Sequence, residues 1–297
     1  MECSGGKLSD MGKPVISRPK EQPPAGRAVE QSVMGPVDKA MEVLSALVET
    51  GAPHRLADLA RRTGLTKPTV HRLLRGLAGS GFVEPAEGGS YRAGPRLLGL
   101  AAAALDSGPA LRRIRPVLAE LRTRTGLLAH YAVRDGDAAV CLEVSEPARE
   151  YALELRPGSR APLLLSAPGL AVLAALPPAE AEEAFSAAEA AGHPLPVSAA
   201  DLRDEIAAAA ERGYAVDDQY EQEDHRALAS AVRDAEGRVV GAVALTGLVF
   251  TLDRAGVELY GPMVRAAARA VSAGLVSDGH PGLTVAREAV RDLGAGL

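Results

Sequence analysis

The sequence predicts an α+β protein of two domains, a small helical domain with a β-hairpin followed by a larger antiparallel sheet covered by helices. Its 297 residues are about two domains long, and a hydrophobic content of 47% is sufficient for two ordinary cores. The hydrophobic pattern also changes along the chain, from helical spacing to helices that alternate with strand-like runs.

Charge is distributed unevenly between the two expected domains. The chain carries a net charge of −5, yet residues 33–105 contain nine basic and six acidic residues, a net of +3. Residues 1–32 contribute +1, from five basic and four acidic residues, so residues 106–297 carry −9. A basic module joined to an acidic one is typical of a protein in which one half contacts phosphates.

The first 32 residues are rich in Gly, Pro, Lys and Ser without apolar periodicity, which predicts a disordered extension over residues 1–32. The first folded domain is expected over residues 33–95. Its first helix is predicted to end near Gly51, because six apolar residues recur at helical spacing, namely Val37, Ala40, Met41, Leu44, Leu47 and Val48.

Two short helices follow within LADLARRTGLTKPTVHRLLRGLAGSGFVEP, residues 56–85. Gly64 supplies a left-handed residue at the end of the first helix, and Thr66 caps the second, with Pro68 in its first turn. In the second helix Arg72 and Arg75 lie opposite an apolar face formed by Val70, Leu73, Leu74 and Leu77.

This second helix has the shape of a DNA-reading helix, which enters the major groove and sets polar side chains against base edges. Lys67, Thr69 and Arg72 suit base edges, and Arg75 and Arg92 suit phosphates. Exposed arginines on a single helix are usually just solvated and do not by themselves indicate DNA binding. Three further features favour DNA binding here: the tight turn before the helix, the local positive charge and the hairpin that follows. The expected DNA-binding residues are Thr66, Lys67, Thr69, His71, Arg72, Arg75 and Arg92.

The segment SGFVEPAEGGSYRAG, residues 80–94, predicts two strands around a Gly-rich turn, with Phe82 and Val83 opposite Tyr91 and Arg92. Such a hairpin is the wing of a winged helix-turn-helix. Residues 96–108 are expected to form a linker helix. One recognition helix contacts too few bases to specify a unique site, so we expect a dimer that uses the linker leucines Leu97, Leu98, Leu100 and Leu105.

The second domain is expected over residues 109–278, with a C-terminal tail over residues 279–297. A helix over residues 110–126 precedes a strand-like run over residues 127–144, which turns at Asp135 and Gly136. The remaining elements are expected in this order: helices near residues 166–176, 179–191 and 200–212, strands near residues 227–232 and 239–246, and a long helix over residues 253–277.

Several motifs occur in one order along residues 33–277, namely LADLARRTGLTKPTVHRLLRGLAGSGFVE, YRAGPRLLGL, PVLAELRTRTG, DGD, PGSRAPL, ERGYAVDD and DAEGRVVGAVALTG. In this order and spacing they resemble the IclR (isocitrate lyase regulator) family of bacterial transcription factors. The resemblance implies a winged helix-turn-helix, a linker helix and a GAF-like effector-binding domain. It also implies a homodimer, or a dimer of dimers, that binds palindromic double-stranded operator DNA as a repressor or an activator and responds to a small-molecule effector.

The resemblance further implies where the effector binds. Family members that take small carboxylates use two backbone amides after the PGSRxPL segment, an Asp, a Cys and two hydroxyls. Asp217 and Thr246 match that pattern, whereas Ala227 replaces the Cys and Pro168 has no amide hydrogen to donate. Leucine also stands where a His is usual, and alanine replaces one hydroxyl. The expected effector-binding positions are Leu164, Ala167, Pro168, Asp217, Ala227, Ala244 and Thr246.

These replacements predict an effector larger and more apolar than glyoxylate or pyruvate, because each carboxylate oxygen buried without a partner costs roughly 1–3 kcal/mol. Two alternatives stay open. In the first, leucine side chains fill the pocket, and the protein is a regulator that acts through protein contacts. In the second, Asp217 and Asp218 are the solvated end of a strand and bind no ligand.

Other classes of protein are less well supported by the sequence. It contains no HExxH, GxSxG, Walker or GxGxxG motif, so we expect neither an enzyme nor a cofactor. His130, Cys141, Asp217 and His225 would form a metal site only if the fold brought them together, because their spacing is unlike that of metal ligands. A third possible class is a protein whose acidic second domain serves as a platform for binding other proteins.

Location follows from what the sequence lacks. It has no apolar run of about 18 residues and no apolar core of a signal peptide near its N-terminus. Cys3 and Cys141 suggest neither a disulfide framework nor a metal knuckle. We therefore expect a cytoplasmic protein without a membrane partner.

Overall fold

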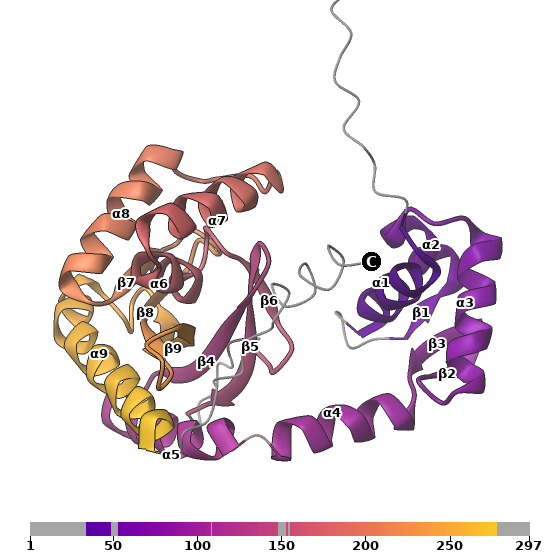
Figure 1. The fold of residues 1–297 in the computed structure, drawn as a ribbon, viewed down its shortest axis with the longest axis horizontal. Helices are drawn as coiled ribbons and strands as arrows, with labels where there is room; N and C mark the ends of the chain where they lie inside the picture. Colours follow the sequence, from indigo (N-terminus) through magenta and orange to yellow (C-terminus); the bar gives the residue numbers. More distant parts are fainter. Residues whose placement is uncertain (1–33, 49–52, 108, 148–152, 154, 278–297) are drawn as a thin grey trace, which may run out of the picture.

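A computed structural model of the chain describes residues 34–48, 53–107, 109–147, 153 and 155–277 (Figure 1). It contains a helical N-terminal domain and an α+β C-terminal domain, connected through the helix α4 (Pro95–Ser107). This is the fold class that the sequence predicts. The expected extension over residues 1–32 and tail over residues 279–297 lie outside the described residues.

The N-terminal domain packs three helices against a small sheet. The helices are α1 (Pro36–Val48), α2 (Leu56–Thr63) and α3 (Lys67–Gly79), and the strands are β1 (His54–Arg55), β2 (Val83–Ala86) and β3 (Ser90–Ala93), in the order β1-β3-β2. Gly64 ends α2 in the left-handed conformation, with φ of 66°, and so turns the chain tightly into α3. The predicted helix-turn-helix and wing are both present.

The core of this domain is a closed apolar cluster. Its members with no more than 2% exposure come from all three helices and from β2: Val43, Leu47, Leu59, Val70, Leu74 and Val83. On α1 the predicted stripe is only partly right. Leu44 and Leu47 are buried, but Val37, Met41 and Val48 are 70%, 48% and 42% exposed, because the helix turns its Val43 side to the core.

The wing differs from its predicted register by two residues. Val83 pairs with Ala93, and Glu84 pairs with Arg92, so Phe82 and Val83 do not face Tyr91 and Arg92. The shift arises because the connection is a single turn of three residues, Glu87–Gly89, with both glycines at positive φ.

The C-terminal domain is built on a six-stranded antiparallel sheet of order β6-β5-β4-β9-β8-β7. The strands are β4 (Leu128–Asp135), β5 (Ala138–Ser145), β6 (Arg160–Pro162), β7 (Ala215–Asp218), β8 (His225–Arg233) and β9 (Val239–Leu248). The β4–β5 turn consists of Gly136 and Asp137, one residue later than predicted, since Asp135 pairs with Ala138. The sequence does not predict β1 and β6, whose two and three residues are too few to show a period.

Helices cover both faces of this sheet (Figure 1). On one face lie α5 (Pro109–Thr125) and α9 (Arg254–Ser277), and on the other lie α6 (Ala167–Ala175), α7 (Pro178–Ala190) and α8 (Ala199–Arg212). Alternation along β9 produces the two cores, because Val243 and Leu245 point to the first face while Ala242 and Ala244 point to the second. None of the described helices is both long and apolar enough to span a bilayer.

Candidate functional site

The first candidate site is the outer face of α3. Val70 and Leu74 are completely buried, so helical geometry directs the opposite residues outward. Thr69 is half-buried and its hydroxyl lies 2.9 Å from that of Thr66, the residue that precedes the helix. The remaining predicted DNA-binding residues of this helix are exposed: Lys67, His71, Arg72 and Arg75.

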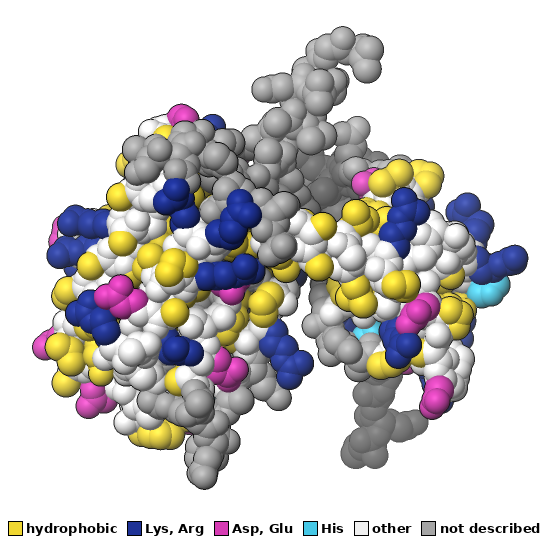
Figure 2. Space-filling view, turned by 90° about the horizontal axis from the view of Figure 1, so that it is seen from below, with side chains coloured by type: hydrophobic (Ala, Val, Ile, Leu, Met, Phe, Trp, Pro, Cys, Tyr) yellow, Lys and Arg dark blue, Asp and Glu magenta, His cyan; other side chains and the backbone are white. Residues whose placement is uncertain are grey.

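The basic side chains of this face form no ion pair within the described part of the chain. No carboxylate of the described residues pairs with Lys67, Arg72 or Arg75. Figure 2 shows basic and histidine side chains gathered at the outer edge of the N-terminal domain, where α3 lies. Exposed cations without an internal counter-ion are the arrangement that phosphate recognition needs.

The wing contributes its charge differently. Arg92 is exposed, but its Nε donates to Glu84 across the hairpin at 2.6 Å. A phosphate would therefore compete with Glu84 for this guanidinium. Arg55 on β1 is an exposed basic residue of the same sheet that the sequence analysis missed, because two residues give no strand signal.

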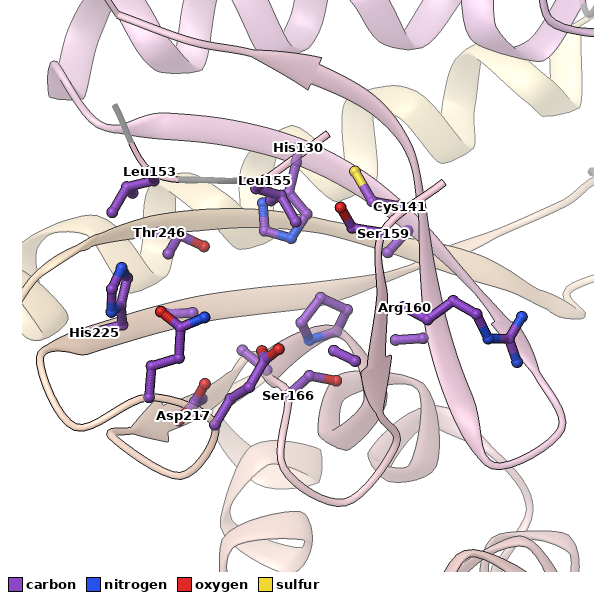
Figure 3. Close-up of a pocket in the computed structure, with 18 residues that line it drawn as sticks. His130, Cys141, Leu153, Leu155, Ser159, Arg160, Ser166, Asp217, His225 and Thr246 are labelled. Carbon is purple, nitrogen blue, oxygen red and sulfur yellow. The ribbon is translucent and has the colours of Figure 1, made fainter. Parts of the chain in front are cut away.

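The second candidate site is a pocket of about 290 Å³ in the C-terminal domain (Figure 3). It lies where β4, β5, β8 and β9 meet the start of α6, whose N-cap Ser166 accepts a hydrogen bond from the amide of Gly169 at 3.3 Å. Gly169 is required there, because a Cβ would lie 1.9 Å from the carbonyl oxygen of Leu163. Polar side chains reach the pocket from several elements: His130, Ser159, Ser166, Asp217, His225 and Thr246.

Five of the seven predicted effector positions line this pocket together, namely Ala167, Pro168, Asp217, Ala227 and Thr246. Leu164 and Ala244 do not. They are 2% and 0% exposed in the neighbouring core, where α6 packs on the sheet. The sequence analysis did not single out Ser159 or Ser166 as pocket residues, although Ser159 belongs to the quoted PGSRAPL segment.

Asp217 is not a solvated strand end. It is 4% exposed, and its Oδ1 accepts a hydrogen bond from the Tyr220 amide at 2.7 Å. Burial raises the pKa of Asp217 to about 7, so the carboxyl group is half protonated near neutral pH. Asp218 faces the other way and forms an ion pair with Arg226 at 2.6 Å.

Each of the two histidines that line the pocket has a ring nitrogen without a hydrogen-bond partner among the described residues. Burial lowers the pKa of His130 to about 4, and its Nδ1 has no hydrogen-bond partner. The Nδ1 of His225 also has none. Burial raises the pKa of the Cys141 thiol to about 12, which keeps it protonated. Although these residues share one pocket with Asp217, no three or more His, Cys, Asp or Glu side chains of the described part lie close enough together to hold a metal ion.

Arg160 is the one cationic side chain among the described lining residues, and it is already neutralised. Its Nη1 lies 2.7 Å from Oδ2 of Asp135, and Figure 3 shows the guanidinium directed away from the other polar groups. Among the described lining residues, a buried anion would therefore meet no lysine or unpaired arginine side chain.

Comparison with known proteins identifies the family of both domains. Residues 36–87 match the IclR helix-turn-helix domain, and residues 102–273 match the bacterial transcriptional regulator IclR C-terminal domain. The chain therefore belongs to the IclR family of transcriptional regulators, and its N-terminal domain is a DNA-binding helix-turn-helix.

Individual relatives align with more than four fifths of this chain and with nearly the whole of their own. The chain is 28% identical to the HTH-type transcriptional regulator XynR of Escherichia coli over 82% of this chain and 97% of XynR. It is 24% identical to the transcriptional repressor IclR of Escherichia coli, over 88% and 97%. An IclR homologue of Microbacterium hydrocarbonoxydans, crystallised with 4-hydroxybenzoate, superposes with a TM-score of 0.65 at 25% identity, over 82% and 100%.

Replacing Asp217 by Asn tests the electrostatic state of the pocket. The folded pKa of about 7 lies above the usual value of about 3.9, so burial of this group costs nothing extra below about pH 4 and destabilises the fold as pH rises towards 7. Asn keeps an acceptor for the Tyr220 amide but does not titrate. We expect the Asp217→Asn variant to gain stability relative to the parent across that window, by up to about 4 kcal/mol. Urea unfolding from pH 4 to 8 measures this, and a difference that does not change with pH would contradict it.

Proposed function

We propose that this chain is a sequence-specific regulator of transcription that reads operator DNA with α3 and changes its operator affinity when a small molecule binds the C-terminal pocket. The observation that carries the proposal is the unpaired cationic face of α3 opposite its buried residues Val70 and Leu74. Such a regulator acts in the cytoplasm, where its operator lies. The repressors among its relatives favour repression over activation.

Residues of α3 divide by position into base-reading and phosphate-holding groups. Lys67, Thr69 and Arg72 occupy its first two turns, the part of a recognition helix that reaches base edges. Arg75 lies one turn further and is suited to the DNA backbone. Arg92 on the wing joins the phosphate contacts once it leaves Glu84.

A dimer is the form that this surface favours. Along α4, Leu98 and Leu100 are 58% and 53% exposed, and Figure 2 shows hydrophobic side chains along this helix. The outward side of α1 adds Val37 and Met41, which the N-terminal core leaves exposed. Paired through these helices, two chains would present two recognition helices to successive major grooves about 34–36 Å apart.

The effector is larger and more apolar than a small carboxylate such as pyruvate. Alanines, Pro168 and two leucines supply the apolar walls, and Arg160, the one arginine among the described lining residues, is paired with Asp135. Asp217 and Thr246 are placed to orient a hydroxyl or an amine. The homologue that holds 4-hydroxybenzoate supports a ligand of ring size, and the open pocket here does not favour one filled by leucines.

The dimer is tested by replacing Leu98 and Leu100 with Ser. These side chains are exposed in the monomer, so the variant should fold, yet it should lose the apolar contact between chains. Light scattering at micromolar concentration should give a dimer mass or twice that mass for the parent and a monomer mass for the variant. A monomeric parent that binds operator DNA with full affinity would contradict the proposal.

The base-reading role is tested by replacing Arg72 with Ala. Loss of a bidentate base contact should weaken operator binding by about 1–3 kcal/mol and relax the preference at one position of each half-site. Arg75→Ala is the matched control. It should weaken all sequences alike and flatten the salt dependence. Fluorescence anisotropy on single-base operator variants separates the two, and an unchanged preference in Arg72→Ala would show that another residue reads that base.

The pocket is tested by thermal-shift and calorimetric screening of pyruvate against aromatic alcohols, amines and lactones. We expect negligible pyruvate binding, since each unpaired carboxylate oxygen costs roughly 1–3 kcal/mol on burial. A compound of the second group should bind and release operator DNA, and Asp217→Ala should weaken it without changing ligand-free DNA binding. Tight binding of pyruvate, or no ligand that alters DNA affinity, would contradict the proposal.

A further inference from the structure

A second cleft of about 360 Å³ lies at the other end of α6 from the effector pocket. It opens where β8 runs past the start of β7, whose first residue, Ala215, pairs with Ala229 of β8. Helices α6, α8 and α9 enclose it, and alanines form half of its described lining. The two cavities share no lining residue.

Three arginines line this cleft, and among its described lining residues there is no carboxylate. They are Arg233 on β8 and Arg265 and Arg269 on α9. Within the described part of the chain, none of the three forms an ion pair with an acidic side chain. This concentration of charge is unexpected in a half of the protein that carries a net charge of −9.

Backbone carbonyl groups hold two of the guanidinium groups in place without neutralising them. Arg233 donates to the carbonyl oxygens of Gly237 at 2.8 Å and Ala175 at 2.5 Å, and Arg265 donates to that of Arg212 at 3.0 Å. Each retains further N–H groups, because a guanidinium has five donors. Arg269 is exposed and has no hydrogen-bond partner among the described residues.

The chain is shaped to bring Arg265 into this position. Gly213 ends α8 with φ of 84°, and a Cβ on it would lie 2.6 Å from Cδ of Arg265. Glycine thus allows the arginine side chain to lie directly against the backbone at the edge of the cleft. The hydroxyl groups of Ser230 and Ser272 donate to backbone carbonyls, so the arginines supply the free donors.

We propose that this cleft binds a small molecule that carries two or more negative charges, such as a phosphorylated or polycarboxylate metabolite. Arginine pairs with carboxylate and phosphate through two parallel hydrogen bonds, and three of them with no competing acid suit a polyanion. The volume fits a small ligand rather than a peptide segment. Operator DNA is a poor candidate, because α8 and α9 lie on the side of the C-terminal domain away from α3 (Figure 1).

Calorimetry of the full chain with pyrophosphate and with citrate tests the proposal, at constant ionic strength. The parent should give saturable binding of at least one of them and none of acetate. Preference for pyrophosphate assigns a phosphorylated ligand, and preference for citrate assigns a polycarboxylate. Arg269→Gln should weaken binding roughly ten- to a hundredfold, and Arg265→Gln with Arg269→Gln should abolish it.

Arg254→Gln is the matched control, because Arg254 is an exposed arginine of α9 that does not line the cleft. Its affinity for the anion should equal that of the parent. The proposal is overturned if neither anion binds saturably, if Arg254→Gln weakens binding as much as Arg269→Gln, or if the cleft variants change only the oligomeric mass, which would assign the arginines to a protein interface. Operator binding is read separately, so failure here leaves the DNA-binding proposal standing.

Discussion

The packing of Val70 and Leu74 into the N-terminal core is the contact on which DNA reading depends. Both side chains are completely buried against α1 and α2, and this fixes the rotation of α3 about its own axis. Once that rotation is fixed, 100° per residue places Arg72 and Arg75 in solvent with their charges unpaired. A polar residue at either apolar position would remove this constraint, and rotation of the helix about its axis would then turn both arginines away from the DNA-facing side together.

The C-terminal domain uses its two-faced sheet to build separate cavities around α6. The start of this helix lines the effector pocket, and its end lines the arginine cleft. Their charges are opposite in kind. Among the described lining residues, the first holds Asp217 and one arginine that is paired with Asp135, whereas the second holds three arginines and no carboxylate. Strand β8 also contributes residues to both cavities. A ligand that shifts α6 relative to β8 in one cavity would therefore change the shape of the other.

Helical spacing and turn residues were enough to predict α2, α3 and α4. Their apolar residues recur every three or four positions, and turn residues such as Gly64 mark where a helix ends. The same spacing could not show that α1 turns Val43 rather than Met41 to the core, since apolar residues occur on both sides of that helix. The pocket was predictable only in part. Family likeness indicated Asp217 and Thr246. His130 and His225 line the same pocket because β9 lies between β4 and β8 in the sheet. Pairing between strands that are distant in the sequence leaves no local signal.

The central claim is that two copies of α3 read a defined DNA sequence, and selection from a random duplex library with the full-length chain tests it most directly. The account predicts enrichment of an inverted repeat whose half-sites are centred about 10 base pairs apart or a multiple of that spacing. It also predicts that the repeat is bound at least about a thousandfold more tightly than unselected DNA. Recovery of no common sequence, with binding that depends on salt alone, would contradict it.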